Sequence, residues 1–224
     1  MARGHPGIIS TLASLPFILT GLYVYLFPSD SIQIPGTVVA RSDVQLIGGS
    51  LVAFGIFIFT IGLYVQFAAP SSPTLQSSES IVDKRNPSQR VAFSKALLSV
   101  PFFVVTLHLL FNTIVPYMYP TGSFVVGLYF FSSGVKTYWI NTLTLYIITS
   151  KRVISEYRFI SLRRQEIPLN KIRGIEERKS ILETLAGLGN IWVASGGGGG
   201  SVRVNMKNIE KSSQFASRLR ELVD

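Results

Sequence analysis

Long uncharged apolar runs dominate the first 140 residues of the chain. Three of these runs cover about residues 7–27, 44–69 and 96–119. A helix needs about 20 apolar residues to cross the hydrocarbon core of a bilayer, and the three runs reach that length. A fourth run, about residues 123–140, is shorter and contains Lys136. The pattern therefore predicts a membrane α-helical bundle of four transmembrane helices.

Two of these runs have an alternative interpretation. The first run is longer than the apolar part of a secretory signal peptide, which has about 7–15 residues, and no A-x-A-like cleavage site follows it in Pro28–Gln33. We therefore favour a membrane span over a cleaved signal. The fourth run is short enough to be a re-entrant or interfacial segment instead of a span.

Near residue 138 the pattern changes to alternation with a period of two, which is typical of strands. Leu143, Leu145 and Ile147 alternate with other residues, and a turn-like Ser150-Lys151 follows, so we expect an antiparallel hairpin. Shorter strands are predicted over residues 165–169, 172–177, 190–194 and 202–205.

The chain ends in a predicted amphipathic helix over about residues 210–223. Phe215, Leu219 and Leu222 fall on one face of this helix, and Asn208 is placed to cap it. Strands followed by a single helix predict an α+β domain, in which the helix closes one open end of a bent sheet or barrel.

The charged residues divide the chain at the same place as the pattern does. Only 15% of the 224 residues are charged, against about 25% in soluble domains, and the mean hydropathy is +0.38. Residues 1–140 hold seven basic and four acidic residues, whereas residues 141–224 hold 14 and eight. We therefore divide the chain into a transmembrane region, residues 1–140, and a polar domain, residues 141–224.

The basic residues between the apolar runs predict the orientation in the membrane. The loop over residues 70–95 carries four basic residues, whereas the loop over residues 28–43 carries one. Cytoplasmic loops are enriched in Lys and Arg, so the second loop is expected inside. With four spans, both termini are then cytoplasmic, in a multi-pass protein of the cell membrane.

One polar pair interrupts the third apolar run. His108 and Asn112 lie four residues apart and share a helix face. Polar groups within a span are functional candidates, but they also hold bundles together by hydrogen bonds between helices, and we favour this structural role.

The residues needed for common catalytic sites are absent from the sequence. The chain has no cysteine, and its histidines are His5 and His108. No group has metal-ligand spacing, and no nucleophilic triad can be assembled. The Gly196–Gly200 run lacks the Lys-Ser/Thr of a phosphate-binding loop and is interpreted as a flexible hairpin loop. We therefore expect no enzymatic activity and no catalytic, cofactor-binding or metal site.

Basic residues of the C-terminal domain are the remaining candidates for a binding surface. Each Lys or Arg near an anionic membrane contributes about 1 kcal/mol of attraction. The alternative is a solvated basic face that follows from the positive-inside bias alone. Nucleic acid is not an expected partner, because glutamates interrupt the basic stretches. The candidate contacts for headgroups or a partner are Lys151, Arg152, Arg158, Arg163, Arg164, Lys171 and Arg173.

Three stretches of the C-terminal third carry a family resemblance. They are Tyr146-Ile-Ile-Thr-Ser-Lys-Arg152, Ile167-Pro-Leu-Asn-Lys-Ile172, and the region from Ser180 to Ile191 with its Leu-Ala-Gly-Leu-Gly-Asn. In this order they resemble the bacterial pleckstrin-homology-like domain of small membrane proteins, over about residues 123–224.

The resemblance implies a seven-stranded, strongly bent sheet that is capped by the C-terminal helix. It also implies scaffold roles for five residues. Thr149 and Arg152 would fix the first hairpin, and Pro168 would lie at a sheet edge or strand start. Gly187 and Gly189 would form a tight turn before the next strand.

These features predict an integral membrane protein with a cytoplasmic pleckstrin-homology-like domain. The domain is expected to act as a binding or scaffold module for protein partners, anionic lipid headgroups or further copies of the chain. The partners we expect are thus the lipid bilayer and a protein partner or a homo-oligomer. The alternative is a small transporter or channel that the C-terminal domain gates. A pore needs polar residues along several spans, and only the third shows a pair.

Overall fold

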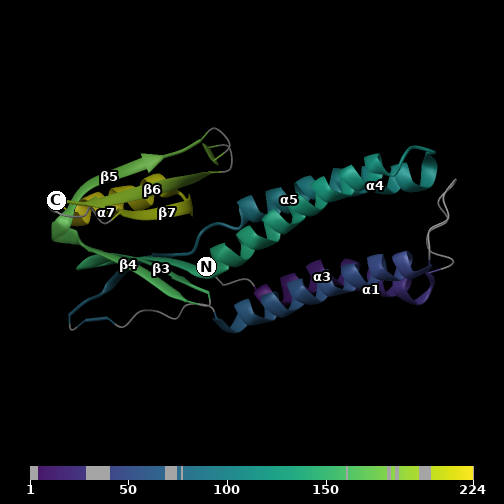
Figure 1. Cartoon of the computed structure of the whole chain (residues 1–224). Coiled ribbons are helices and arrows are strands. Elements are labelled where there is room, and N and C mark those ends of the chain that lie inside the picture. Colours follow the sequence, from purple (N-terminus) through teal and green to yellow (C-terminus); the bar gives the residue numbers. More distant parts are fainter. Residues whose placement is uncertain are drawn as a thin grey trace. The chain divides into compact units, whose positions relative to one another are not determined.

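The chain folds into a helical unit and a β-rich unit, each with its own internal contacts (Figure 1). The helical unit lies within residues 3–67 and 94–136, and the β-rich unit comprises residues 68–93 and 137–224. The computed structural model describes residues 5–28, 41–68, 75–76, 78–159, 161–180, 183–184, 187–196 and 203–223.

Four long helices occupy the predicted apolar runs. They are α1 (Pro6–Leu26), α3 (Arg41–Ala68), α4 (Arg90–Asn112) and α5 (Met118–Thr142). Helices α1, α3 and α4 are long and apolar enough to cross a membrane. Helix α5 has 25 residues, but its C-terminal half is polar, and it does not meet the same criterion. The four predicted helices are therefore present, and three of them are candidate spans.

The connection between α4 and α5 lies earlier in the chain than the sequence pattern indicates. Helix α4 ends at Asn112, and Pro116 lies in the connection, where it prevents continuation of the helix. Pro120, expected in the loop, lies in the first turn of α5, where a missing N–H is harmless.

Glycines and phenylalanines hold the helical unit together. A Cβ on Gly48, Gly55 or Gly62 of α3 would lie 2.0–2.7 Å from atoms of α1, so the two backbones approach closely at intervals of seven residues. Small residues permit this approach in membrane helices. The ring of Phe17 contacts the rings of Phe54 on α3 and Phe131 on α5, with centroids 5.0 and 5.1 Å apart.

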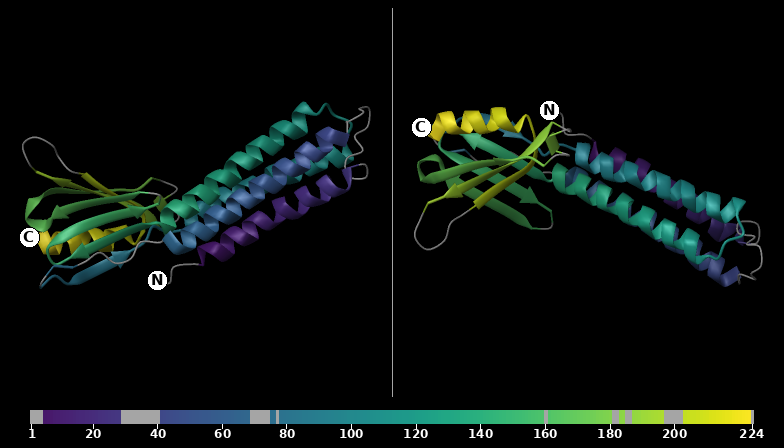
Figure 2. Two further views of the ribbon diagram at one scale, coloured as in Figure 1. Left: turned by 60° about the horizontal axis from the view of Figure 1, so that its bottom comes forward. Right: turned by 90° about the horizontal axis from the view of Figure 1, so that it is seen from above.

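Two antiparallel sheets form the β-rich unit (Figure 2). The first sheet has the order β1-β2-β3-β4 and contains β1 (Ile81–Arg85), β2 (Thr144–Thr149), β3 (Arg152–Arg158) and β4 (Leu162–Pro168). The 3₁₀ turn η1 (Leu169–Lys171) leads into the second sheet. That sheet has the order β5-β6-β7 and contains β5 (Ile172–Arg178), β6 (Leu188–Ser195) and β7 (Arg203–Glu210). Helix α7 (Ser212–Val223) follows.

Strand β1 corrects the interpretation of residues 70–95 as an interhelical loop. It pairs with β2 in a register that sets Ile81 opposite Thr149 and Arg85 opposite Tyr146. Among the described residues, six strands lie within the range of the predicted domain, and β1 supplies a seventh from the segment between α3 and α4. The strands also divide into two sheets rather than one continuous bent sheet.

The main core lies between the two sheets and α7. Of the predicted apolar face of α7, Phe215 and Leu219 are fully buried in this core and Leu222 packs against it while partly buried; Ala216 is also buried there. The Tyr146 hydroxyl accepts a hydrogen bond from the Lys207 N–H at 3.0 Å and so ties β2 to β7. Asn208 does not cap α7, because it lies within β7 with φ of 55°.

Candidate functional site

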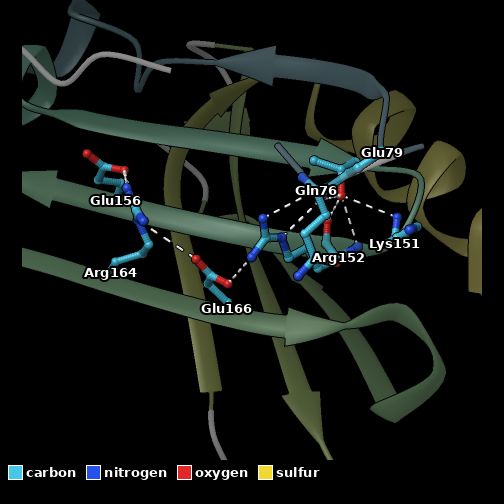
Figure 3. A network of polar contacts seen from close by, with 8 residues as sticks. Gln76, Glu79, Lys151, Arg152, Glu156, Arg164 and Glu166 are labelled. Carbon is cyan, nitrogen blue, oxygen red and sulfur yellow. Dashed lines mark hydrogen bonds and ion pairs between the residues drawn. The ribbon is translucent and has the colours of Figure 1, made fainter. Parts of the chain in front are cut away.

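Arg152, one of the predicted contact residues, is bound within the domain by Glu79 (Figure 3). Its Nε donates to Glu79 Oε1 at 2.9 Å, and its Nη2 donates to Oε2 at 3.0 Å. The hydroxyl of Thr149 and the N–H of Gln76 also donate to this carboxylate, at 2.7 and 2.8 Å. The Glu79 side chain is 0% exposed. These hydrogen bonds, the one from Arg152 foremost, lower the pKa of Glu79 to about 2.

Acidic and basic side chains continue from Arg152 as an alternating ladder across β3 and β4 (Figure 3). Arg152 Nη1 also donates to Glu166, whose other oxygen lies 3.8 Å from Arg164 Nε. Arg164 in turn pairs with the buried Glu156 at 2.9 Å. We call Glu79, Arg152, Glu166, Arg164 and Glu156 the ion ladder. It occupies the guanidinium groups of two predicted contact residues.

The ion ladder lies on the face of the first sheet that points away from the main core. Ile154 of β3 pairs with Glu166, and Ile147 of β2 pairs with Ile154 on the same face. Leu145, Ile147 and Ile154 form a small separate apolar cluster there, and each is fully buried. The aliphatic stems of long charged side chains cover apolar surface in this way while their charged groups pair above it. The ladder therefore has a structural role.

Three other predicted cations lie together at one end of the domain. Lys151 is in the β2–β3 turn, Lys171 is in η1, and Arg173 is in β5; all three are exposed. The Leu169 N–H donates to the Lys151 carbonyl at 3.0 Å, and the Gly196 N–H donates to the Lys171 carbonyl at 3.1 Å. The first bond joins the β2–β3 turn to the start of η1, and Arg173 follows Lys171 by two residues in the same stretch. We call Lys151, Lys171 and Arg173 the basic end.

The remaining two predicted cations lie at the opposite end of the first sheet. Arg158 ends β3, and its N–H donates to the Leu143 carbonyl, just after α5, at 3.1 Å. Arg163 pairs with Tyr157 in the β3–β4 hairpin and is exposed. Neither arginine forms an ion pair with another residue in the described ranges. The seven predicted cations thus fall into three separate places.

The polar pair of the third apolar run lies on α4. His108 and Asn112 are both exposed in the single chain. They do not line an enclosed path within the described residues. Their proposed hydrogen bonding between helices stays a prediction.

Several scaffold roles implied by the resemblance are visible in the structure. The Thr149 hydroxyl, whose hydrogen is donated to Glu79, accepts a hydrogen bond from the Arg152 N–H at 3.0 Å and so closes the β2–β3 turn. Pro168 ends β4, an edge strand. Gly187 has φ of 69°, which favours glycine. Gly189 has a different role, because it lies in β6 where a Cβ would meet Ser212 Oγ at 2.2 Å.

Two further predictions concern a metal site and the glycine-rich run. In the described part of the chain, no three His, Cys, Asp or Glu side chains are grouped so as to hold a metal ion. Of the glycine-rich run, Gly196 is described and follows β6, whereas residues 197–200 lie outside the described residues.

Comparison with known proteins assigns the family. A family model described as "Bacterial PH domain" matches residues 97–223, more than half of the chain. This chain belongs to the bacterial PH domain family. The comparisons found no match among curated proteins and none among solved structures.

The ion ladder extends beyond the range of the family match. Arg152, Glu166, Arg164 and Glu156 all lie within the bacterial PH domain, whereas Glu79 and strand β1 precede its first matched residue. The PH domain of this chain is therefore completed by a segment outside the family match. Sequence reasoning missed Glu79 because its partner Arg152 is 73 residues away. The pair of Arg164 with Glu156 was accessible from the sequence, since both lie on one face of a predicted hairpin.

Proposed function

We propose that this protein is a four-span membrane protein whose cytoplasmic PH domain binds an anionic partner through the basic end. The observation that carries the proposal is the convergence of Lys151 in the β2–β3 turn with Lys171 and Arg173, which belong to a second stretch of the chain. The neighbouring Arg152 is neutralised by glutamates of the ion ladder, whereas the three cations of the basic end are exposed.

The pairing of β1 with β2 supports the four-span count. Strand β1 precedes α4, strand β2 follows α5, and the two form one antiparallel ladder. Both strands must therefore lie on the same side of the membrane. If α4 crosses the bilayer, α5 has to return across it, although its sequence is less apolar. A re-entrant α5 does not satisfy this requirement.

The charge of the segment between α3 and α4 supports the cytoplasmic side. Lys84, Arg85, Arg90 and Lys95 all lie in or just after this segment, and cytoplasmic segments are enriched in such residues. Because β1 belongs to the same sheet as β2, this signal applies directly to the PH domain. Transport is the weaker hypothesis, since His108 and Asn112 are exposed on α4 without an enclosed path.

The proposal is tested with the full chain in nanodiscs of neutral phosphatidylcholine. Two anionic probes are offered separately: vesicles that contain phosphatidylglycerol, and a soluble polyglutamate peptide. We expect binding of at least one probe that weakens as salt increases. The triple variant Lys151→Gln, Lys171→Gln, Arg173→Gln should weaken it by about 10- to 100-fold, at about 1 kcal/mol or less per cation.

A matched variant controls for net charge. Lys84→Gln, Lys207→Gln and Arg220→Gln remove three exposed cations from β1, β7 and α7. This variant should bind the anionic probes nearly as well as the unmodified chain. Equal weakening in both triple variants, or no binding of either probe by the unmodified chain, contradicts the proposal.

A further inference from the structure

The tip of the β3–β4 hairpin combines apolar and cationic side chains. It contains Arg158, Phe159, Leu162 and Arg163, which we call the hairpin tip; Leu162 and Arg163 are exposed, and Arg158 and Phe159 are half-buried. Leu162 is 49% exposed and is followed in β4 by two arginines. Arg163 is exposed, whereas the adjacent Arg164 points to the other face of β4 and pairs with Glu156. The hairpin tip therefore offers apolar surface together with positive charge.

Backbone hydrogen bonds fix the hairpin tip close to the end of α5. The Arg158 N–H donates to the Leu143 carbonyl at 3.1 Å, and the Leu143 N–H donates to the Trp139 carbonyl at 3.0 Å. Leu143 is thus one helical turn, about 5.4 Å, beyond Trp139. This distance is shorter than the Debye length of about 8 Å at physiological salt.

The end of α5 lies beside the start of α4, a candidate membrane span. The Asn141 side chain donates to the Ser88 carbonyl at 2.9 Å, and the rings of Phe93 and Tyr138 are 6.1 Å apart. Trp and Tyr are enriched at the level of the lipid headgroups. The first turn of α4 and the aromatic end of α5 therefore lie side by side, and the backbone of Arg158 is fixed about one helical turn beyond Trp139.

We propose that the hairpin tip contacts the surface of the same membrane that anchors the chain. Leu162 and Phe159 enter the headgroup region, and Arg158 and Arg163 bind anionic lipid headgroups. This inference goes beyond the proposed function and shares with it only the membrane crossing of α4. The basic end is a separate site, since it lies at the other end of β2, which spans six residues and about 20 Å.

The absence of cysteine from the sequence makes the contact directly measurable. A nitroxide is attached to the full chain through Leu162→Cys, and in a second sample through Lys171→Cys at the basic end. Each is reconstituted in vesicles of phosphatidylcholine with or without phosphatidylglycerol. Collisions of the nitroxide with oxygen, which prefers lipid, and with a water-soluble nickel chelate are then compared by electron paramagnetic resonance.

We expect the label at position 162 to collide more with oxygen and less with the nickel chelate than the label at position 171. The difference should increase with phosphatidylglycerol and should decrease when Arg158→Gln and Arg163→Gln are added. Equal access of the nickel chelate to both positions overturns the inference. Protection at 162 that persists without phosphatidylglycerol and without both arginines indicates a protein contact and also overturns it.

The two proposals fail in distinguishable ways. Loss of probe binding at the basic end with a protected position 162 contradicts the proposed function alone. A water-exposed position 162 with intact probe binding contradicts only the membrane contact of the hairpin tip. An unchanged emission spectrum of Trp192 in β6, measured for each variant in a Trp139→Phe background, confirms that the PH domain is folded.

Discussion

A single buried carboxylate joins two segments of this protein that are 73 residues apart in the sequence. Glu79 precedes β1, and it accepts hydrogen bonds from Arg152, Thr149 and Gln76. Removal of one partner from a buried ion pair is strongly destabilising, because the charge of the other partner stays buried without compensation. Glu79 is therefore the residue at which the segment before α4 is most sensitive to substitution.

Glu79→Gln should destabilise the PH domain by about 3 kcal/mol, because it leaves the mostly buried Arg152 with Glu166 as its remaining carboxylate partner. The measurement is urea unfolding of the full chain in nanodiscs, followed by Trp192 fluorescence in a Trp139→Phe background. Glu221→Gln, at an exposed position on α7, serves as the control and should change stability by less than about 0.5 kcal/mol. Equal stability of the two variants contradicts the role of Glu79.

The lowered pKa of Glu79 predicts that the stability of the folded protein depends on pH. Its pKa in the folded protein is about 2, below the ordinary 4.5, so the folded state binds this proton less readily than the unfolded state. The stabilisation is complete above about pH 5 and is lost as pH falls towards 2, with a limit of about 3 kcal/mol. The unfolding midpoint in urea should therefore be nearly constant from pH 7 to 5 and fall below that. Glu79→Gln should flatten this fall, and an unchanged profile contradicts the assignment.

At the scale of single residues, the sequence predicts the cations but not their partners. Arg163 and Arg164 are adjacent and both belong to the predicted set, yet alternation along β4 places them on opposite faces, where Arg164 pairs with Glu156. That distinction follows from the strand pattern once the hairpin register is known. The partner of Arg152 does not, because no local pattern connects it with Glu79.

Among the elements, those with strong periodicity are predictable from the sequence. The apolar runs predict four helices, and alternation around Leu145 predicts the β2–β3 hairpin. Strand β1 has the sequence IVDKR, with three charged residues in five and no alternation, so only its pairing with β2 defines it. The connection before α5 was misplaced because both Pro116 and Pro120 are turn-like residues, and only tertiary structure selects between them.

Strand β1 predicts the behaviour of fragments of the domain. A fragment of residues 141–224 should aggregate, because removal of β1 exposes the edge of β2, whose six residues are all buried in the full chain. Joining residues 75–88 to residue 141 through a short Gly-Ser linker should restore a soluble domain, since Ser88 and Asn141 are in contact. Size-exclusion chromatography and amide NMR dispersion compare the two. A well-folded monomer from residues 141–224 alone contradicts the importance of β1.

At the scale of the whole molecule, the single cysteine-free chain allows its topology to be mapped. With four spans, Ile114→Cys in the α4–α5 connection should react from outside intact cells with a membrane-impermeant maleimide. Lys171→Cys at the basic end should react only after lysis. Reaction of both positions from the same side contradicts the four-span arrangement and with it the cytoplasmic PH domain.

The pairing of β1 with β2 also has a consequence for synthesis. The ribosome adds about 60 residues between the end of β1 and the end of β2, which takes roughly 3–12 s at about 5–20 residues per second. During that interval β1 has no partner, and the chain in between is the α4–α5 hairpin. If α4 and α5 both cross the membrane as proposed, their insertion returns the chain to the side on which β1 lies. In the proposed four-span arrangement, membrane insertion is thus a folding step of the PH domain, and a chain in which α4 crosses without the return of α5 leaves β1 and β2 on opposite sides of the membrane.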